Sequence, residues 1–217
     1  MKIDLSIKTN EYFSGDRPEM LKYIPSKAGR ILDVGCGKGN FGAYLRKRNQ
    51  AEVWGVEYEP LQAEKARTQL DKIFSGDIAV IIDQLPANYF DVIVCNDVLE
   101  HLTDPYTVLE KMRNKLTNDG VVVSSIPNIR YFRNFFDLVF RKNWDYTDNG
   151  IMDKTHYRFF TIKSIPKMFD DTGYEVIQFE GINATKSIRP VLWNALCLGF
   201  FSDIRYLQFA TVAKAKK

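Results

Sequence analysis

The chain is poor in the residues that bind metals or form covalent cross-links. Its 217 residues include only two histidines and three cysteines. Cys36, Cys95 and Cys197 lie far apart and form no C-x-x-C pair. This spacing argues against a disulfide framework and against a zinc site. We therefore expect no metal, and we expect a reducing compartment, the cytoplasm.

The sequence also lacks a strong net charge and a long hydrophobic run. A formal net charge of +3 and no basic stripe beyond residues 214–217 argue against a nucleic-acid partner. Residues 1–5 do not begin an apolar signal segment, so no signal peptide is expected. The most apolar segment, residues 191–201, has about half the length needed to cross a bilayer. We expect it to be a buried helix, with a monotopic membrane contact as the alternative.

Strand and helix patterns alternate from residue 30 to about residue 126, which predicts a parallel sheet covered by helices on both faces. The expected strands are 30–34, 52–57, 72–75, 90–95 and 121–126, and the expected helices are 41–48, 61–70, 78–83 and one beginning at Pro105, capped by Asp104. Asn118-Asp119-Gly120 is expected to turn the chain into the last of these strands. The length fits one domain, residues 1–217.

A glycine loop follows the first strand. Gly35, Gly37 and Gly39 alternate directly after Asp33, and a helical pattern then begins. Glycine lets the backbone adopt positive φ and lets a ligand lie against the main chain. The start of the helix offers unpaired N–H groups. This arrangement predicts a ligand that carries a nucleoside.

The loop alone leaves the identity of that ligand open. Gly37-x-Gly39-x-x-Gly42 also matches the dinucleotide fingerprint, and both kinds of site place an acidic residue one strand later. Glu57 occupies that position and is predicted to hold both ribose hydroxyls.

Further motifs resemble the class I S-adenosylmethionine (SAM)-dependent methyltransferases. Asp33-x-Gly35-x-Gly37-x-Gly39 is similar to the family's first motif, Gly76-Asp77-Ile78 to its adenine segment, and residues 90–102 to its fourth strand and following loop. Lys115-Leu116-Thr117-Asn118-Asp119-Gly120 resembles its L-K-P-G-G turn, with Asn118-Asp119 in place of Pro-Gly.

The resemblance implies an α/β fold: a doubly wound, Rossmann-like, mostly parallel seven-stranded sheet with an antiparallel last strand. It also implies SAM as the cofactor. Asp33 would orient the N–H groups of the glycine loop and reach the amino group of the ligand through water. Asp77 would lie near adenine, and Asn96 would face the methionine portion.

The region after residue 126 resembles particular subgroups of this family. Residues 126–130, Trp144-x-Tyr146 and residues 150–161 are similar to a subgroup associated with bacterial polysaccharide and sugar biosynthesis. Ubiquinone-biosynthesis O-methyltransferases share much of the core, including Glu100-His101-Leu102. The implied function is methyl transfer to a small-molecule acceptor, a sugar or glycan-precursor hydroxyl. The alternatives are a quinone-type or other O- or N-methyltransferase, a non-catalytic SAM-binding protein, and an NAD-dependent oxidoreductase.

Two histidines are the candidate catalytic bases, because imidazole titrates near neutral pH. His101 follows strand four, and His156 lies in an insertion at residues 128–162 that we expect on the substrate side. Arg130 and Arg158 are predicted to hold a phosphate of the acceptor. Trp144 and Tyr146 are predicted to contact its ring.

Further expectations concern the segments that flank this core. Phe132, Phe136 and Phe140 recur at helical spacing, which favours core packing, with Asn128 as the helix cap. The later elements are a helix at 164–171 that ends at Gly173, a strand at 174–179, a helix at 190–200 and a strand at 206–213. Residues 1–29 are predicted to cover the ligand through Tyr12, Arg17 and Tyr23, with Arg17 pairing the methionine carboxylate.

Overall fold

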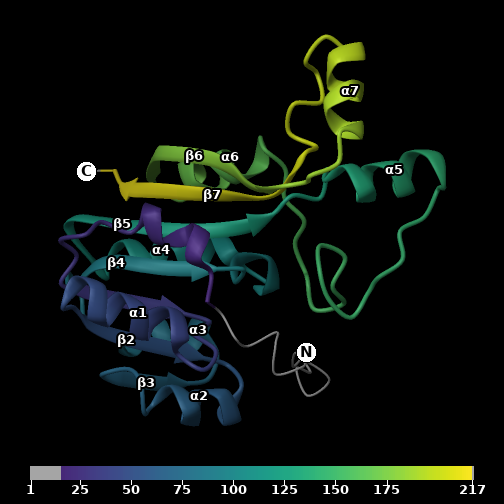
Figure 1. The fold of residues 1–217 in the computed structure, drawn as a ribbon. Helices are drawn as coiled ribbons and strands as arrows, with labels where there is room; N and C mark the ends of the chain where they lie inside the picture. Colours follow the sequence, from purple (N-terminus) through teal and green to yellow (C-terminus); the bar gives the residue numbers. More distant parts are fainter. Residues whose placement is uncertain (1–15, 217) are drawn as a thin grey trace.

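The structure, a computed structural model, describes residues 16–216 and contains a seven-stranded sheet at its centre (Figure 1). The strands lie in the order β3-β2-β1-β4-β5-β7-β6. Strands β1 to β5 are parallel, and β7 pairs antiparallel with both β5 and β6. The expected doubly wound sheet with an antiparallel last strand is confirmed. The strands are β1 (Arg30–Val34), β2 (Glu52–Glu57), β3 (Lys72–Ser75), β4 (Phe90–Asn96), β5 (Leu116–Pro127), β6 (Tyr174–Ala184) and β7 (Tyr206–Ala215).

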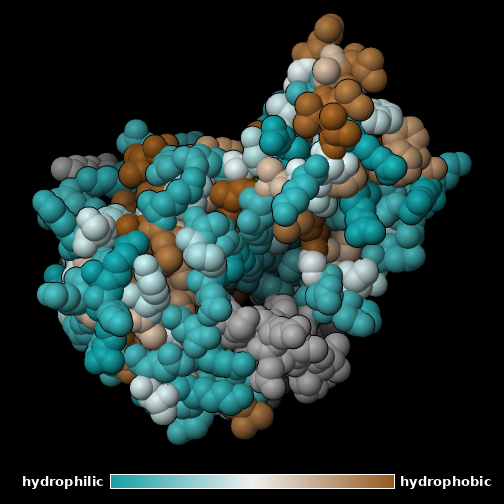
Figure 2. All heavy atoms as spheres, in the orientation of Figure 1, coloured by the Kyte–Doolittle hydropathy of each residue, from teal (hydrophilic) through white to brown (hydrophobic). Residues whose placement is uncertain are grey.

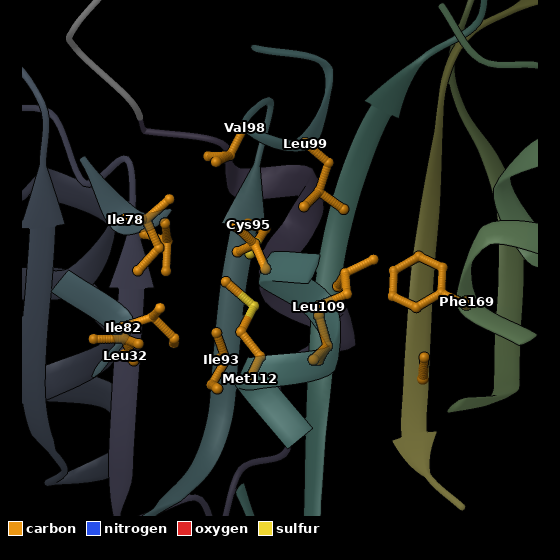
Figure 3. Packing of buried hydrophobic residues seen from close by; sticks show 14 of the residues in the cluster. Leu32, Ile78, Ile82, Ile93, Cys95, Val98, Leu99, Leu109, Met112 and Phe169 are labelled. Atoms are coloured by element: carbon orange, nitrogen blue, oxygen red, sulfur yellow. The ribbon is translucent and has the colours of Figure 1, made fainter. Parts of the chain in front are cut away.

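Helices cover both faces of this sheet. The helical elements are η1 (Pro18–Tyr23), α1 (Asn40–Asn49), α2 (Pro60–Ala66), α3 (Ile78–Ile81), η2 (Ile82–Gln84), η3 (Leu99–His101), α4 (Pro105–Arg113), α5 (Phe132–Phe140), α6 (Ser164–Asp171) and α7 (Arg189–Leu196). Alternate residues of β4 enter different cores: Ile93 and Cys95 pack with α3, α4 and α6, whereas Val92 and Val94 pack with η1, α1 and α2. Figure 3 shows the first core, where Leu109 and Met112 of α4 reach the sheet. A central strand buried on both faces reads as a continuous apolar run, which is why sequence predicted it.

Several helix ends follow the predicted signals. The Asp104 carboxylate accepts a hydrogen bond from the Thr107 N–H at 3.1 Å, and Pro105 occupies the first helical position of α4. Gly173 follows α6 with φ +82°, the left-handed conformation that glycine adopts at little cost. These signals are local, so tertiary packing does not change them.

The aromatic helix α5 does not enter the core, and the prediction for it is wrong. None of its residues is buried, and Phe136 and Phe140 stack on each other with ring centroids 4.7 Å apart. Its cap prediction is also wrong. The N-cap residue is Tyr131, while the Asn128 side chain donates hydrogen bonds to the carbonyls of residues 203 and 206 in the β7 connection.

The apolar segment at residues 191–201 is likewise exposed rather than buried. Leu196 and Leu198 are 82% and 98% exposed, and hydrophobic side chains gather on α7 where it stands away from the sheet (Figures 1 and 2). The segment rests on α5 through Trp193 against Phe140, with ring centroids 5.6 Å apart. Asn194 is the only polar residue of the segment 191–201, so the sequence gives no periodic signal that separates a buried side from an exposed one. Within residues 16–216, no helix combines the length and apolarity that crossing a bilayer requires.

Smaller differences concern element ends. Residues 118–120 lie within β5, with a register shift against β4, and do not form a separate turn. Helix α2 ends at Ala66, four residues before the predicted end, and β6 continues five residues beyond the predicted strand. Cys36 and Cys95, which lie at or just beyond the ends of β1 and β4, are buried free thiols.

Candidate functional site

A cavity of about 1020 Å³ opens at the carboxyl ends of β1, β2 and β4. Doubly wound sheets bind ligands at this edge, where the strand order reverses between β1 and β4. Figure 2 shows the surface hollowed beside the sheet. The predicted site residues that line the cavity are Arg17, Asp33, Gly35, Gly37, Glu57, Asp77, Asn96, His101 and His156.

The glycine loop is fixed to the neighbouring strand through its backbone. The N–H groups of Gly35 and Cys36 donate to the Val56 carbonyl at 2.8 and 3.2 Å. Gly35 and Gly37 have φ angles of +69° and +55°. A Cβ atom on Gly35 would lie 2.7 Å from a methyl group of Val98, so the position has no room for a side chain. The loop therefore presents bare backbone to the cavity.

Glu57, the last residue of β2, holds the glycine loop in place. Its carboxylate accepts hydrogen bonds from the Gly37 N–H at 2.7 Å and the Glu59 N–H at 2.8 Å. Burial raises the pKa of Glu57, and these two N–H groups oppose the rise. Each carboxylate oxygen can accept more than one hydrogen bond, so both retain capacity for a ligand.

Asp33 is buried beneath the loop. Desolvation by burial, with the negative charge of Glu57 added, raises the pKa of Asp33 to about 7. A backbone hydrogen bond from Gly42 opposes this rise. The Oδ2 atom of Asp33 has no hydrogen-bond partner among residues 16–216. The sequence analysis placed Asp33 on the loop N–H groups, whereas the structure gives Glu57 that contact.

The remaining predicted cofactor residues divide into two groups. Asp77 caps α3 by accepting from the Ala79 N–H at 2.8 Å, and Asn96 ends β4 with a buried Oδ1 that lacks a partner in the described part of the chain. Both line the cavity. Gly39 does not: a Cβ there would lie 3.2–3.3 Å from atoms of Ala66 and Leu70. Its lack of a side chain serves the packing between α1 and the α2 segment.

Arg17 enters the cavity wall but already has protein partners. Its guanidinium pairs with Asp97 and donates to Ser125 at 3.0 Å and to Gln208 at 3.2 Å. Asp97 has φ +53° and directly follows Asn96. It was not among the residues predicted for the site, although its neighbour Asn96 was. Tyr23 points elsewhere and donates to Glu180 at 2.8 Å. Tyr12 lies outside the described residues.

The two candidate bases are brought together by the fold. The His101 and His156 rings meet edge to face with centroids 4.5 Å apart. The insertion is fixed here because the N–H groups of Tyr157 and Arg158 donate to the Glu100 carbonyl at 2.9 and 3.1 Å. This contact joins the insertion to η3.

Glu100 is a site residue that the sequence analysis missed. It is 1% exposed, it lines the cavity, and neither carboxylate oxygen has a hydrogen-bond partner among residues 16–216. Burial raises the pKa of Glu100 to about 8, the negative charge of Asp153 adds to the rise, and the positive charge of Arg17 opposes it. Its place directly before His101 at the end of strand four was the available signal.

The four predicted substrate residues lie outside the cavity lining. Arg130 forms a two-pronged ion pair with the buried Asp203 at 2.7 and 3.1 Å, and Arg158 donates to the Thr103 carbonyl. Trp144 and Tyr146 pack around Phe159, with ring centroids 5.4 and 6.2 Å away. The structure therefore does not bring these side chains to the cavity. Residues 151 and 157 line it from the insertion instead.

Comparisons with known proteins agree on one family for this chain. Residues 8–179 match the family model described as "Methyltransferase domain". A ubiquinone biosynthesis O-methyltransferase of Neisseria meningitidis is 26% identical over 202 residues, covering 88% of this chain and 82% of the relative. A protein of that name from Yersinia enterocolitica is 33% identical over 123 residues, covering 51% of this chain and 50% of the relative. The chain spans about half the length of most curated relatives that it matches.

The solved structures agree on the fold. A SAM-dependent methyltransferase from Archaeoglobus fulgidus superposes with a TM-score of 0.71 at 19% identity, over 90% of this chain and 91% of that chain. At 19% identity this similarity shows the fold alone. The family itself is shown by the family model, which matches most of the chain. The chain therefore belongs to the methyltransferase-domain family, within the class I SAM-dependent methyltransferases.

Proposed function

We propose that the protein transfers a methyl group from SAM to a hydroxyl of a small molecule. The cofactor lies along the ends of β1, β2 and β4, with Glu57 on the ribose and Asp77 near adenine. Two buried acceptor atoms without partners among residues 16–216, Asp33 Oδ2 and Asn96 Oδ1, suit the donors of the methionine portion. Buried polar atoms normally find a partner, and a bound ligand would supply one.

The two histidines are the reason for proposing a hydroxyl group as the methyl acceptor. The bound cofactor supplies an activated methyl group on a sulfonium, so the protein has chiefly to position and deprotonate the acceptor. His101 and His156 line the same cavity as the glycine loop. A neutral imidazole at that place takes the proton from a hydroxyl near neutral pH. This juxtaposition is the observation on which the proposal depends.

Two acceptor classes have support from different observations. The motifs after residue 126 resemble the polysaccharide and sugar subgroup, which favours a hydroxyl of a sugar or glycan precursor. The names of the relatives favour a ring hydroxyl of a ubiquinone precursor. Ile151 and Tyr157 give the cavity wall an apolar and aromatic component. A panel containing nucleotide sugars and catechols therefore forms the appropriate acceptor screen.

Cofactor binding is tested by calorimetric titration with S-adenosylhomocysteine, with NAD as the control ligand. We expect saturable micromolar binding of the first and none of the second. Glu57→Ala removes two hydrogen bonds to a charged group, about 3 kcal/mol or about 100-fold in affinity. Glu64→Ala, which removes an exposed carboxylate paired with Arg67, is the matched control and leaves affinity unchanged.

Turnover is tested by mass spectrometry of the acceptor panel. We expect one acceptor to gain a methyl group and His101→Ala or His156→Ala to slow transfer without weakening S-adenosylhomocysteine binding. Binding of NAD alone would overturn the cofactor assignment. Cofactor binding without transfer to either acceptor class would favour a binding protein.

A further inference from the structure

Glu100, His101 and His156 form a compact cluster on the cavity wall. One ring nitrogen of each histidine and a carboxylate oxygen of Glu100 lie within 4.8 Å of one another. The three residues come from segments more than fifty positions apart, and the hydrogen bonds from residues 157 and 158 to the Glu100 carbonyl hold the segments together. The cluster therefore belongs to the folded architecture of the site.

The tautomer of both rings is set by backbone carbonyls. His101 Nδ1 lies 3.1 Å from the Thr155 carbonyl, and His156 Nδ1 lies 2.8 Å from the Ile151 carbonyl. A carbonyl only accepts, so both Nδ1 atoms carry a proton. The Thr155 hydroxyl, also 3.1 Å from His101 Nδ1, gives its own proton to Asp153 at 2.8 Å and accepts as well. In each neutral ring the lone pair is consequently on Nε2.

This arrangement is the usual support of a metal-bound histidine. A histidine that binds a metal typically donates its other ring N–H to a carbonyl or carboxylate, which fixes the ring and raises its basicity. Here both rings have that support from the same short segment, residues 151–155. A general base needs one such ring, and the structure provides two that meet at 4.5 Å.

Glu100 adds an acidic oxygen donor to the two nitrogens. Its side chain is almost completely buried, and neither carboxylate oxygen has a hydrogen-bond partner within residues 16–216. Ionising a buried carboxyl group that has no partners is costly, and a bound cation would offset that cost. This orphaned carboxylate is the second observation that points to a ligand.

We infer that Glu100, His101 and His156 bind a divalent transition metal ion of the zinc type, with an open coordination position facing the cavity. Imidazole nitrogens select zinc, iron, cobalt or nickel rather than magnesium or calcium. Three protein ligands plus an open position are typical of a catalytic metal site. Metal–nitrogen bonds of 2.0–2.1 Å place tetrahedral ligand atoms about 3.3 Å apart, so small side-chain movements close the cluster around the ion.

The role of the ion rests on the proposed function, whereas its binding does not. An acceptor hydroxyl at the open position would lose its proton to water more readily. The resulting oxygen would form the new bond to the methyl carbon as the sulfonium bond to that carbon breaks. The histidines would then act as ligands. No metal was expected from the sequence, because the chain has only two histidines and no paired cysteines.

Metal binding is measured on the whole chain, free of any histidine tag and without cofactor or acceptor. We expect Zn²⁺ titration to show one ion per chain, Mg²⁺ to give no signal, and Co²⁺ to produce visible absorption that Zn²⁺ abolishes. His101→Ala and His156→Ala should each weaken Zn²⁺ binding by at least about tenfold. Cys197→Ser is the matched control, because Cys197 is the only cysteine of the chain that is not buried, and it should leave binding unchanged.

S-adenosylhomocysteine titration of every variant checks the fold and separates the two proposals. No Zn²⁺ binding by protein that binds S-adenosylhomocysteine would overturn the metal site and leave the proposed function standing. Unchanged Zn²⁺ affinity in His156→Ala would overturn it as well. Zn²⁺ binding lost in both histidine variants, with no methyl transfer to any acceptor, would support the site and count against the proposed function.

Discussion

Replacing Gly35 by alanine tests the physical basis of the glycine loop. The residue has φ +69°, and the new Cβ would lie 2.7 Å from Val98 Cγ2. The left-handed backbone costs alanine about 1 kcal/mol, and crowding in a packed region costs about 1–3 kcal/mol. We expect a loss of about 2–4 kcal/mol in the free energy of unfolding, measured by urea denaturation.

Two further variants separate these contributions. Gly199 has φ +88° with nothing within 4 Å of an added Cβ, so Gly199→Ala carries the backbone cost alone, about 1 kcal/mol. Val98→Ala in the Gly35→Ala background removes the colliding methyl group and should restore about 1–3 kcal/mol relative to additivity. S-adenosylhomocysteine affinity should fall at least about tenfold in Gly35→Ala and recover in the double variant. Equal losses in the two glycine variants, or a double-mutant cycle without coupling, would refute the reasoning.

Three other predictions concern stability, all read from urea denaturation. The pKa of Asp33 is raised from 3.8 to about 7, so the folded state keeps a proton that the unfolded state releases. The contribution of Asp33 to stability without ligand therefore falls between about pH 4 and 7, by up to about 4 kcal/mol, and then levels off. Asp33→Asn should remove this part of the pH dependence and leave the part due to Glu100, whose pKa is also raised, and an unchanged slope would contradict the prediction. Arg130→Ala leaves the buried Asp203 without its ion-pair partner and should lower the free energy of unfolding by about 1–3 kcal/mol. Arg130→Lys should recover part of this loss. An unchanged free energy of unfolding in Arg130→Ala would mean that the ion pair contributes nothing to stability. Phe169 is fully buried and Leu198 is almost fully exposed. Phe169→Ala should therefore lower the free energy of unfolding by about 3–5 kcal/mol, and Leu198→Ala by less than about 0.5 kcal/mol. Similar losses would contradict the exposure of the segment after α7.

The first three strands could be predicted to the residue. The sequence predictions for β1, β2 and β3 match the observed bounds. Their signal is local: β1 and β2 are short apolar runs buried on both faces, and β3 is a short edge strand that ends before Gly76. The same holds for the loop after β1, whose glycine spacing encodes backbone conformation directly.

The long-range part of the site could not be predicted in this way. Trp144 and Tyr146 were assigned to the acceptor because aromatic residues in a polar loop suit ring contacts, but they pack on Phe159. His156 and Glu100 meet because backbone groups of the insertion find the Glu100 carbonyl, and sequence carries no sign of that pairing. The exposure of α5 and α7 was missed because apolar spacing is the same whether or not a helix has a core to cover.

The position of β7 has a consequence for the order in which the chain acquires its structure. Among the described residues, β6 pairs with β7 alone, and β7 begins about 20 residues after β6 ends, beyond α7. Until β7 inserts, β5 is an open edge and β6 has nothing to pair with. Closing the sheet joins β5 to a strand some 80 residues further on, the kind of non-local step that slows folding. A newly synthesised chain therefore exposes the β5 edge until its last strand is released, and that edge is where a chaperone or a second unfinished chain would bind.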